Sequence, residues 1–436
     1  MPGALTRRGA AGAGPADLRS CPPSRGTERE RGADDAGVHT AKTEPLIEAP
    51  QRGADGGRGG PDRRNSFDAV RLAAALAVVM AHQLNIAGYA LPGYGQPSIG
   101  PGGPKLADAG LYVFFALSGY LVFQSLDGDP RIGRFLAARA LRIYPGVVVN
   151  VALCLLFGAA VTNLPAAAYW GSAETWRFFL HDAAVILTPT AFQLPGALWE
   201  SRWPSVNVPL WTLKYEILCY AVLLAFYKGV TLLAGERGAR TARTGALAVA
   251  AAAMAAWFAY GRAHPPPPNG GLDTLGAFSE VHVVRFFAVF SAGAAYAAAG
   301  PSSRGVRWAA VGLIAAAVLA GPTPEVRFVA LVLAIGLGAI LLGRSRLLYS
   351  RAYHRIGDLS YGTYLYAFPI QMLTLSRWLD ANNFWMLTLI DVLLALGCAT
   401  LSWRFVERPA LRLKRRRGVR AGAPDGSLAT AHATSV

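Results

Sequence analysis

The sequence predicts an all-α protein, a polytopic membrane helix bundle of about ten transmembrane helices with both termini in the cytoplasm. Three observations lead to this prediction. Of the 436 residues, 53% are hydrophobic and only 16% are charged, whereas a soluble domain usually carries about 25% charged residues. The apolar residues come in runs of about 20, the length that a helix needs to cross a bilayer. The basic residues lie mainly between those runs.

Lipid offers the backbone no hydrogen-bond partner, so apolar runs of this length are expected to be helical. The strands of a membrane barrel would be shorter and would alternate apolar and polar residues. In chain order, the predicted spans are Phe67–Gly88, Leu106–Leu126, Ala140–Val161, Val208–Lys228, Thr244–Tyr260, Val281–Ala299, Val306–Ala320, Val326–Leu342, Leu359–Arg377 and Phe384–Val406.

Arginine and lysine indicate how the bundle is oriented, because cytoplasmic loops carry an excess of both. Arg63 and Arg64 precede the first span, and basic clusters recur after every second span, while the connections between them are poor in base. This alternation is consistent only if the shorter apolar segment Phe178–Phe192 does not cross the membrane. The sequence therefore predicts a re-entrant or interfacial segment there, in a multi-pass protein of the inner or plasma membrane.

Composition divides the chain into three regions. Residues 1–65 are rich in Gly, Ala, Arg, Pro and Asp and are expected to form a disordered, basic cytoplasmic tail. Residues 66–414 form the membrane domain, and 415–436 are a second, short disordered cytoplasmic tail. The net charge of +16 lies in the tails and loops, as the orientation requires, so no nucleic-acid partner is expected. The four cysteines form no CxxC pair, which argues against a metal site or a disulfide framework.

The first span contains two basic residues that are costly at membrane depth. His82 follows Arg71 by eleven residues, about three helical turns, which puts both on one face about 16 Å apart along the axis. An imidazole inside a bundle is suited to general-base catalysis. The simpler alternatives are that Arg71 extends to the headgroups, or pairs with Asp68, and that His82 hydrogen-bonds a neighbouring helix.

Glu216 lies near the start of the fourth span. If that helix begins on the outer side, the carboxylate falls at a depth similar to that of His82, where it would orient the imidazole. The alternative is an ion pair with Lys214 or a hydrogen bond between helices.

Arg139 and Arg142 stand at the cytoplasmic mouth of the third span. Their i, i+3 spacing puts both guanidinium groups on one side, an arrangement suited to phosphates, although plain orientation signals would look the same. Glu407, at the end of the last span, is expected to pair with a nearby arginine. Ser118 and Gly119 are interpreted as a point of close helix packing.

Six sequence elements in this order resemble the membrane acyltransferase family three, whose members acylate the sugars of O-antigen, exopolysaccharide, Nod factor and macrolides. The resemblance runs from Asn65 to about Lys414. The elements are Arg71 with His82, the second-span motif Gly110–Val122, the paired arginines in Phe135–Pro145, Leu210–Glu216, Ile356–Tyr366 and Phe405–Pro409. Two positions depart from the family pattern: Thr212 replaces the commoner Ser, and Ala367 stands where many members carry His.

The resemblance implies that residues 66–414 are a membrane acyltransferase domain that uses acyl-coenzyme A as a co-substrate, without a permanently bound cofactor or a metal. Arg139 and Arg142, with Arg71, would bind the phosphates of the donor. His82 would take a proton from a hydroxyl of a carbohydrate or glycosylated metabolite, or would carry the acyl group itself. Glu216 would hold or polarise the imidazole. Acetyl is the expected acyl group.

A different class of function remains open from the residues alone. A proton-coupled transporter or flippase of a glycan or small molecule would also bury Arg71, His82 and Glu216 as a relay. Transporters commonly show inverted repeats and paired broken helices, and neither is evident in the sequence, so acyl transfer is the favoured interpretation.

Overall fold

The computed structural model describes residues 65–185, 191–199, 201, 204–263, 279–300, 308, 311–312, 314–315, 318–319, 323–380 and 382–413. Among these residues the chain is helical throughout, apart from connecting loops and two isolated β-bridges. The predicted tails, 1–65 and 415–436, lie outside the described residues except for Asn65. The predicted span Val306–Ala320 also lies mostly outside them.

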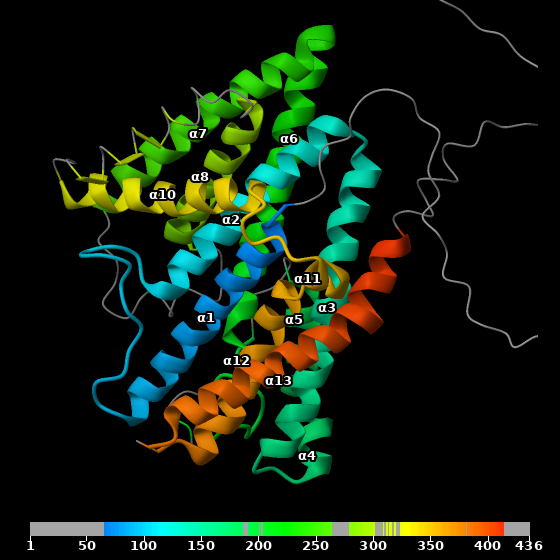
Figure 1. Cartoon of the computed structure of the whole chain (residues 1–436). Coiled ribbons are helices and arrows are strands. Elements are labelled where there is room, and N and C mark those ends of the chain that lie inside the picture. The colour runs from blue at the N-terminus through cyan, green and yellow to red at the C-terminus, as the bar shows by residue number, and fades with distance from the viewer. Residues whose placement is uncertain are drawn as a thin grey trace, which may run out of the picture. The chain divides into compact units, whose positions relative to one another are not determined.

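Figure 1 shows the arrangement of the helices. They are α1 (Phe67–Ala90), α2 (Leu106–Gly128), α3 (Ile132–Val161), α4 (Ala166–Gly171), α5 (Ala173–Ala184), α6 (Leu213–Ala234), α7 (Gly238–Ala263), α8 (Glu280–Ala298), α10 (Pro324–Arg344), α11 (Arg351–Ile356), α12 (Ser360–Trp378) and α13 (Phe384–Ser402). Short 3₁₀ turns, η1 (Val208–Thr212) and η2 (Gly235–Arg237), flank α6, and a π-helical turn, η4 (Trp403–Glu407), extends α13.

Within the described residues, seven helices are long and apolar enough to cross a membrane. Nine of the ten predicted spans coincide with helices in the same part of the chain, which confirms a multi-pass helical architecture. The total of ten spans and the cytoplasmic location of the termini stay predictions. Helix α5 has only 12 residues, too few at 1.5 Å each to cross the hydrocarbon core, in keeping with a segment that does not cross.

Small residues let the helices at the centre of the bundle approach closely. Helix α2 packs along α8, where Gly119 faces Gly293: a methyl group on Gly119 would overlap the carbonyl oxygen of Phe290, and one on Gly293 would overlap that of Ala116. Lipid tails are as apolar as leucine, so helices in a membrane associate through such close packing rather than through hydrophobic burial alone. This contact confirms the interpretation of Gly119 as a packing point.

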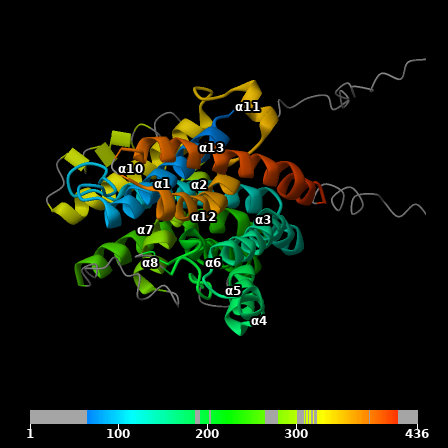
Figure 2. The same ribbon diagram turned by 90° about the horizontal axis from the view of Figure 1, so that it is seen from below.

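Helices α1, α12 and α13 run side by side, and Figure 2 shows the same group from below. Helix α12 contains Pro369, which has no N–H to donate to the carbonyl of Leu365 one turn earlier. Two buried amides replace the missing donor, because Asn150 of α3 and Asn207 before η1 both donate to the Leu365 oxygen, at 3.0 and 3.1 Å. The proline therefore creates the polar point at which these three segments join.

The first prediction concerns the contact between α2 and α8. Gly119→Ala should lower the stability of the protein in detergent by about 1–3 kcal/mol, because the added methyl group forces the two backbones apart. Gly397→Ala is the matched control: this mid-helix glycine of α13 has open space around its Cβ position, so alanine should be neutral or stabilising by up to about 1 kcal/mol. Thermal unfolding of both variants measures the difference, and equal midpoints would contradict the packing role.

A second prediction concerns the amide clamp on α12. Asn150→Ala should cost about 1–3 kcal/mol, because it leaves a buried carbonyl with one donor fewer. In a Pro369→Ala background the helix regains its own donor, so the same substitution should cost clearly less. A double-mutant cycle in a denaturing detergent measures this coupling, expected at about 1 kcal/mol. Additive losses would show that the asparagine does not compensate for the proline.

Candidate active site

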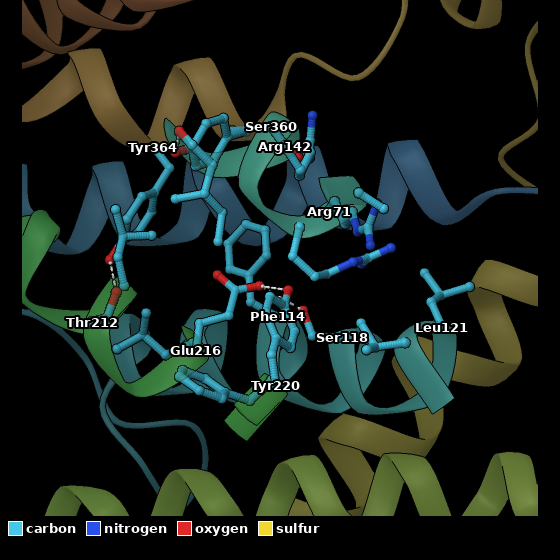
Figure 3. Close-up of a pocket in the computed structure, with 18 of the residues that line it drawn as sticks. Arg71, Phe114, Ser118, Leu121, Arg142, Thr212, Glu216, Tyr220, Ser360 and Tyr364 are labelled. Atoms are coloured by element: carbon cyan, nitrogen blue, oxygen red, sulfur yellow. Dashed lines mark hydrogen bonds between the residues drawn. The ribbon is translucent and has the colours of Figure 1, made fainter. Parts of the chain in front are cut away.

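Helices α1, α2, α3, α6 and α12 surround a cavity of about 300 Å³ (Figure 3). Four of the five residues singled out from the sequence line it: Arg71, Arg139, Arg142 and Glu216. Figure 3 shows that the Arg71 and Glu216 side chains face the same space. Residues that are far apart in the chain thus form one strongly charged site inside the bundle.

Two carboxylates flank Arg142. Its Nη2 atom lies 2.5 Å from Oδ2 of Asp358, and its Nη1 atom lies 3.2 Å from Oε2 of Glu407. The Glu407 side chain is only 2% exposed and sits on the π-helical turn η4, a local rewinding that is frequent at functional sites. The expected pairing of Glu407 with an arginine is confirmed. Of the two arginines Arg139 and Arg142 on α3, Arg142 is therefore already paired within the protein.

Asp358 also binds Arg71, 3.5 Å away, and its other carboxylate oxygen accepts the backbone N–H of Ser360 at the start of α12. Burial alone would raise the pKa of Asp358, but Arg142 and Arg71 hold it below its usual value. The proposed pairing of Arg71 with Asp68 is not the one formed. Asp68 instead lies 3.9 Å from His354, because the chain before α12 brings a second carboxylate to Arg71.

Arg139 differs from the other two arginines. Among the described residues it has no carboxylate partner, and its Nε atom is buried without a hydrogen bond. The guanidinium group lies over the rings of Tyr220 and Phe135, with 5.6 and 5.9 Å from Cζ to the ring centroids. Of the three arginines that line this cavity, Arg139 is thus the one whose charge is not paired with a carboxylate of the described residues.

Glu216 is held by two hydroxyl groups. Ser118 of α2 donates to Oε1 at 3.0 Å, and Tyr220 donates to the same oxygen, while no hydrogen bond from the described residues reaches Oε2. Sequence reasoning treated Ser118 as a packing residue and did not use Tyr220. The i, i+4 spacing of Glu216 and Tyr220 on one helix could have indicated the second contact, but the contact with α2 has no local signal.

His82 is not among the residues that line the cavity. Its ring meets Phe368 of α12 edge to face, with centroids 5.1 Å apart, and its Nδ1 atom is buried without a hydrogen-bond partner among the described residues. Ala75 and Val78, both buried, lie between Arg71 and His82 on the same face of α1. The structure therefore places Glu216 beside the arginines and leaves the imidazole further along α1, without the expected contact between the two.

The two departures from the family pattern have simple structural outcomes. Thr212 keeps the hydroxyl of the commoner serine, which lies 2.6 Å from the Tyr364 hydroxyl at the wall of the cavity. Ala367 packs in a small apolar cluster with Val79 and Ala395, so this position carries no polar group in the present chain.

Comparisons with known proteins identify the family of the chain. A family model described as an acyltransferase domain matches residues 64–405. Nodulation protein 10 of Rhizobium leguminosarum bv. viciae is 28% identical over 379 residues, which cover 80% of this chain and 94% of that protein. The O-acetyl transferase of Shigella phage Sf6 is 32% identical over 165 residues, 37% of this chain and 45% of the phage protein. No solved structure matches the chain.

A third prediction separates the two arginines of α3. Arg142→Ala should destabilise the protein by about 3 kcal/mol, because it leaves the buried Asp358 and Glu407 without their shared cation. Arg139→Ala, one turn away on the same helix, removes no ion pair and should leave the unfolding midpoint close to that of the unchanged protein. Thermal unfolding in detergent compares the two. A larger loss at Arg139 would contradict the assignment of Arg142 as the structural cation.

Proposed function

The chain belongs to the family of acyltransferase domains that matches residues 64–405, and we propose that this membrane O-acyltransferase moves an acyl group, by default acetyl, from acyl-coenzyme A to a hydroxyl of a carbohydrate or glycosylated metabolite. The observation that carries the proposal is the cavity lined by Arg71, Arg139, Arg142 and Glu216. We further propose the inner or plasma membrane as its location, with the arginine end of the cavity facing the cytoplasm, where acyl-coenzyme A is made.

The ion pairs of the cavity support different roles for its three arginines in the proposed donor site. Arg71 and Arg142 share Asp358, and Arg142 also binds Glu407. Arg139 would therefore be the main ligand of a donor phosphate, with Arg71 and Arg142 adding positive charge while they hold the wall of the cavity. A volume of about 300 Å³ is at the lower end for ligand pockets. It suits the thin pantetheine arm rather than the whole coenzyme.

The chemistry would take place further along α1, at His82. The distance of about 16 Å along the axis from Arg71 to His82 is comparable to the length of a pantetheine arm. The neutral imidazole would accept the hydroxyl proton of the acceptor as its oxygen attacks the thioester carbonyl. As the C–S bond breaks, the imidazolium would give that proton to the leaving thiolate. In the alternative path, His82 would itself take the acyl group and pass it on. Its Nδ1 atom is buried and has no hydrogen-bond partner among the described residues, which is what either role needs.

Glu216 would act from the wall of the cavity. Its two hydroxyl donors fix one oxygen and leave the other available to a bound group. Contact with the His82 imidazole, as expected from the sequence, would require that ligand binding bring the two closer. The names of the relatives support acyl transfer to oxygen, since the phage protein is called an O-acetyl transferase. The carbohydrate acceptor is our proposal from the resemblance.

The fourth prediction tests the role of His82. Membranes that contain His82→Ala should transfer label from radiolabelled acetyl-coenzyme A to a glycan and metabolite extract at least about 100-fold more slowly than the unchanged protein, the usual contribution of a positioned base. His181→Ala is the control, since His181 lies on α5 and does not line the cavity. Normal transfer by the folded His82→Ala variant would refute the proposed mechanism.

A further inference from the structure

A second polar cluster lies within the bundle, outside the cavity. It consists of Gln83 of α1, Gln371 and Thr374 of α12, and Asp391 of α13, all of them buried. Gln83 donates to Asp391 at 2.9 Å, and Thr374 donates to the other carboxylate oxygen at 2.8 Å. Among the described residues, Asp391 has no cationic partner. The proposed mechanism uses none of these side chains. Polar groups are costly to bury at this depth, and those that occur there commonly have a function.

The cluster holds α1 at two points one helical turn apart. The side-chain amide of Gln371 donates to the carbonyl oxygen of Val79 at 2.8 Å and to the side-chain oxygen of Gln83 at 2.6 Å. Bonds to two points of one helix face fix both the rotation of that helix about its axis and its position along the axis. The three helices that carry these residues, α1, α12 and α13, lie side by side (Figure 1).

His82 is the immediate neighbour of Gln83, so its direction follows from the rotation of α1. The same segment of α12 supplies the contact to its ring, because Phe368, which meets the imidazole edge to face, stands three residues before Gln371. A rotation of α1 by a few tens of degrees would break the bonds to Gln371 and Asp391 and would also turn the imidazole away from Phe368. The polar cluster and the ring contact are therefore coupled.

We propose that Gln83, Gln371 and Asp391 are positioning residues that fix the imidazole of His82 for acyl transfer. The inference rests on the proposed role of His82. It adds to that role the residues that orient the imidazole ring. The cluster does not touch the arginine-lined cavity, so it should govern the rate of the chemical step and not the affinity for the donor. A misplacement of about 1 Å at a reacting group can cost about 100-fold in rate.

The test compares steady-state kinetics of Gln83→Leu, Asp391→Leu, Asp391→Asn and Thr374→Val. The two leucine variants should lower kcat by about 10- to 100-fold and leave the donor KM within about twofold. Asn can accept from Gln83 and donate to Thr374, so Asp391→Asn should keep most of the activity. Thr374→Val removes one of the two bonds to Asp391 and leaves that from Gln83, so it should lower kcat less. If the leucine variants do not fold, the Asn and Val variants still test the order of effects.

Thr388→Val is the matched control. It deletes a buried hydroxyl on α13 whose bond stays within its own helix, to the carbonyl of Phe384, so kcat should not change. If kcat fell in this control as much as in Asp391→Leu, the loss of kcat would be a general effect of disturbing the helix packing. That result would overturn the inference. So would a Gln83→Leu variant that folds and keeps a normal kcat.

A second readout does not depend on catalysis. Diethyl pyrocarbonate modifies unprotonated imidazoles, and mass spectrometry of the peptide that contains His82 measures the rate. Gln83→Leu should change that rate and Thr388→Val should not. If His82→Ala kept full activity while the modification rate of Gln83→Leu changed, the proposed catalytic role of His82 would fail, and the cluster would position the ring without serving acyl transfer. If His82→Ala were inactive while the kcat and modification rate of Gln83→Leu were normal, the positioning would fail alone.

Discussion

The arrangement of the arginine-lined cavity depends on the ion pairs that the carboxylate of Asp358 forms. This carboxylate stands between Arg71 of α1 and Arg142 of α3 and also accepts the first N–H of α12. Three helices that are distant in sequence are thereby joined by one buried group. Because an unpaired charge in a helix bundle is costly, these helices cannot separate without exposing an arginine or a carboxylate to an apolar surrounding. The arginines that we propose as ligands of the donor therefore also hold the walls of the cavity in place.

Charge balance explains why three arginines at one site are not equivalent. Asp358 and Glu407 compensate Arg142 and part of Arg71, and Glu216 is already engaged by two hydroxyls. A phosphate that enters the cavity would gain most from Arg139, whose surroundings are two aromatic rings. A guanidinium over aromatic faces keeps its charge and its donors while its apolar surface is covered. Because Arg139 has no carboxylate partner among the described residues, the proposed binding of a phosphate there would not require the ion pairs of Arg71 and Arg142 to rearrange.

The sequence predicted the helices well and the side-chain partners less well, for a physical reason. Hydrocarbon thickness fixes the length of a span, so long apolar runs such as 326–342 could be placed by counting. The same counting put Arg71 and His82 on one face of α1. Partners on other helices depend on tilt, rotation and loop paths, which no local pattern encodes. Glu216 was therefore expected beside His82 but lies beside Ser118. Asp358, which pairs with both Arg71 and Arg142, was not predicted as a site residue.

Helix α1 connects the two ends of this arrangement. It carries Arg71 at the charged cavity and His82 about three turns further on, and it is held at both levels, by Asp358 at one and by Gln371 with Asp391 at the other. A rigid helix held at two levels keeps a constant distance between the group that would recognise the donor and the group that would react. For a donor whose reactive thioester lies at the end of a long, flexible arm, this distance determines which chemical group arrives at the imidazole. In the proposed mechanism the separation of His82 from the arginines would therefore be required, because a base placed beside the phosphates would not reach the thioester.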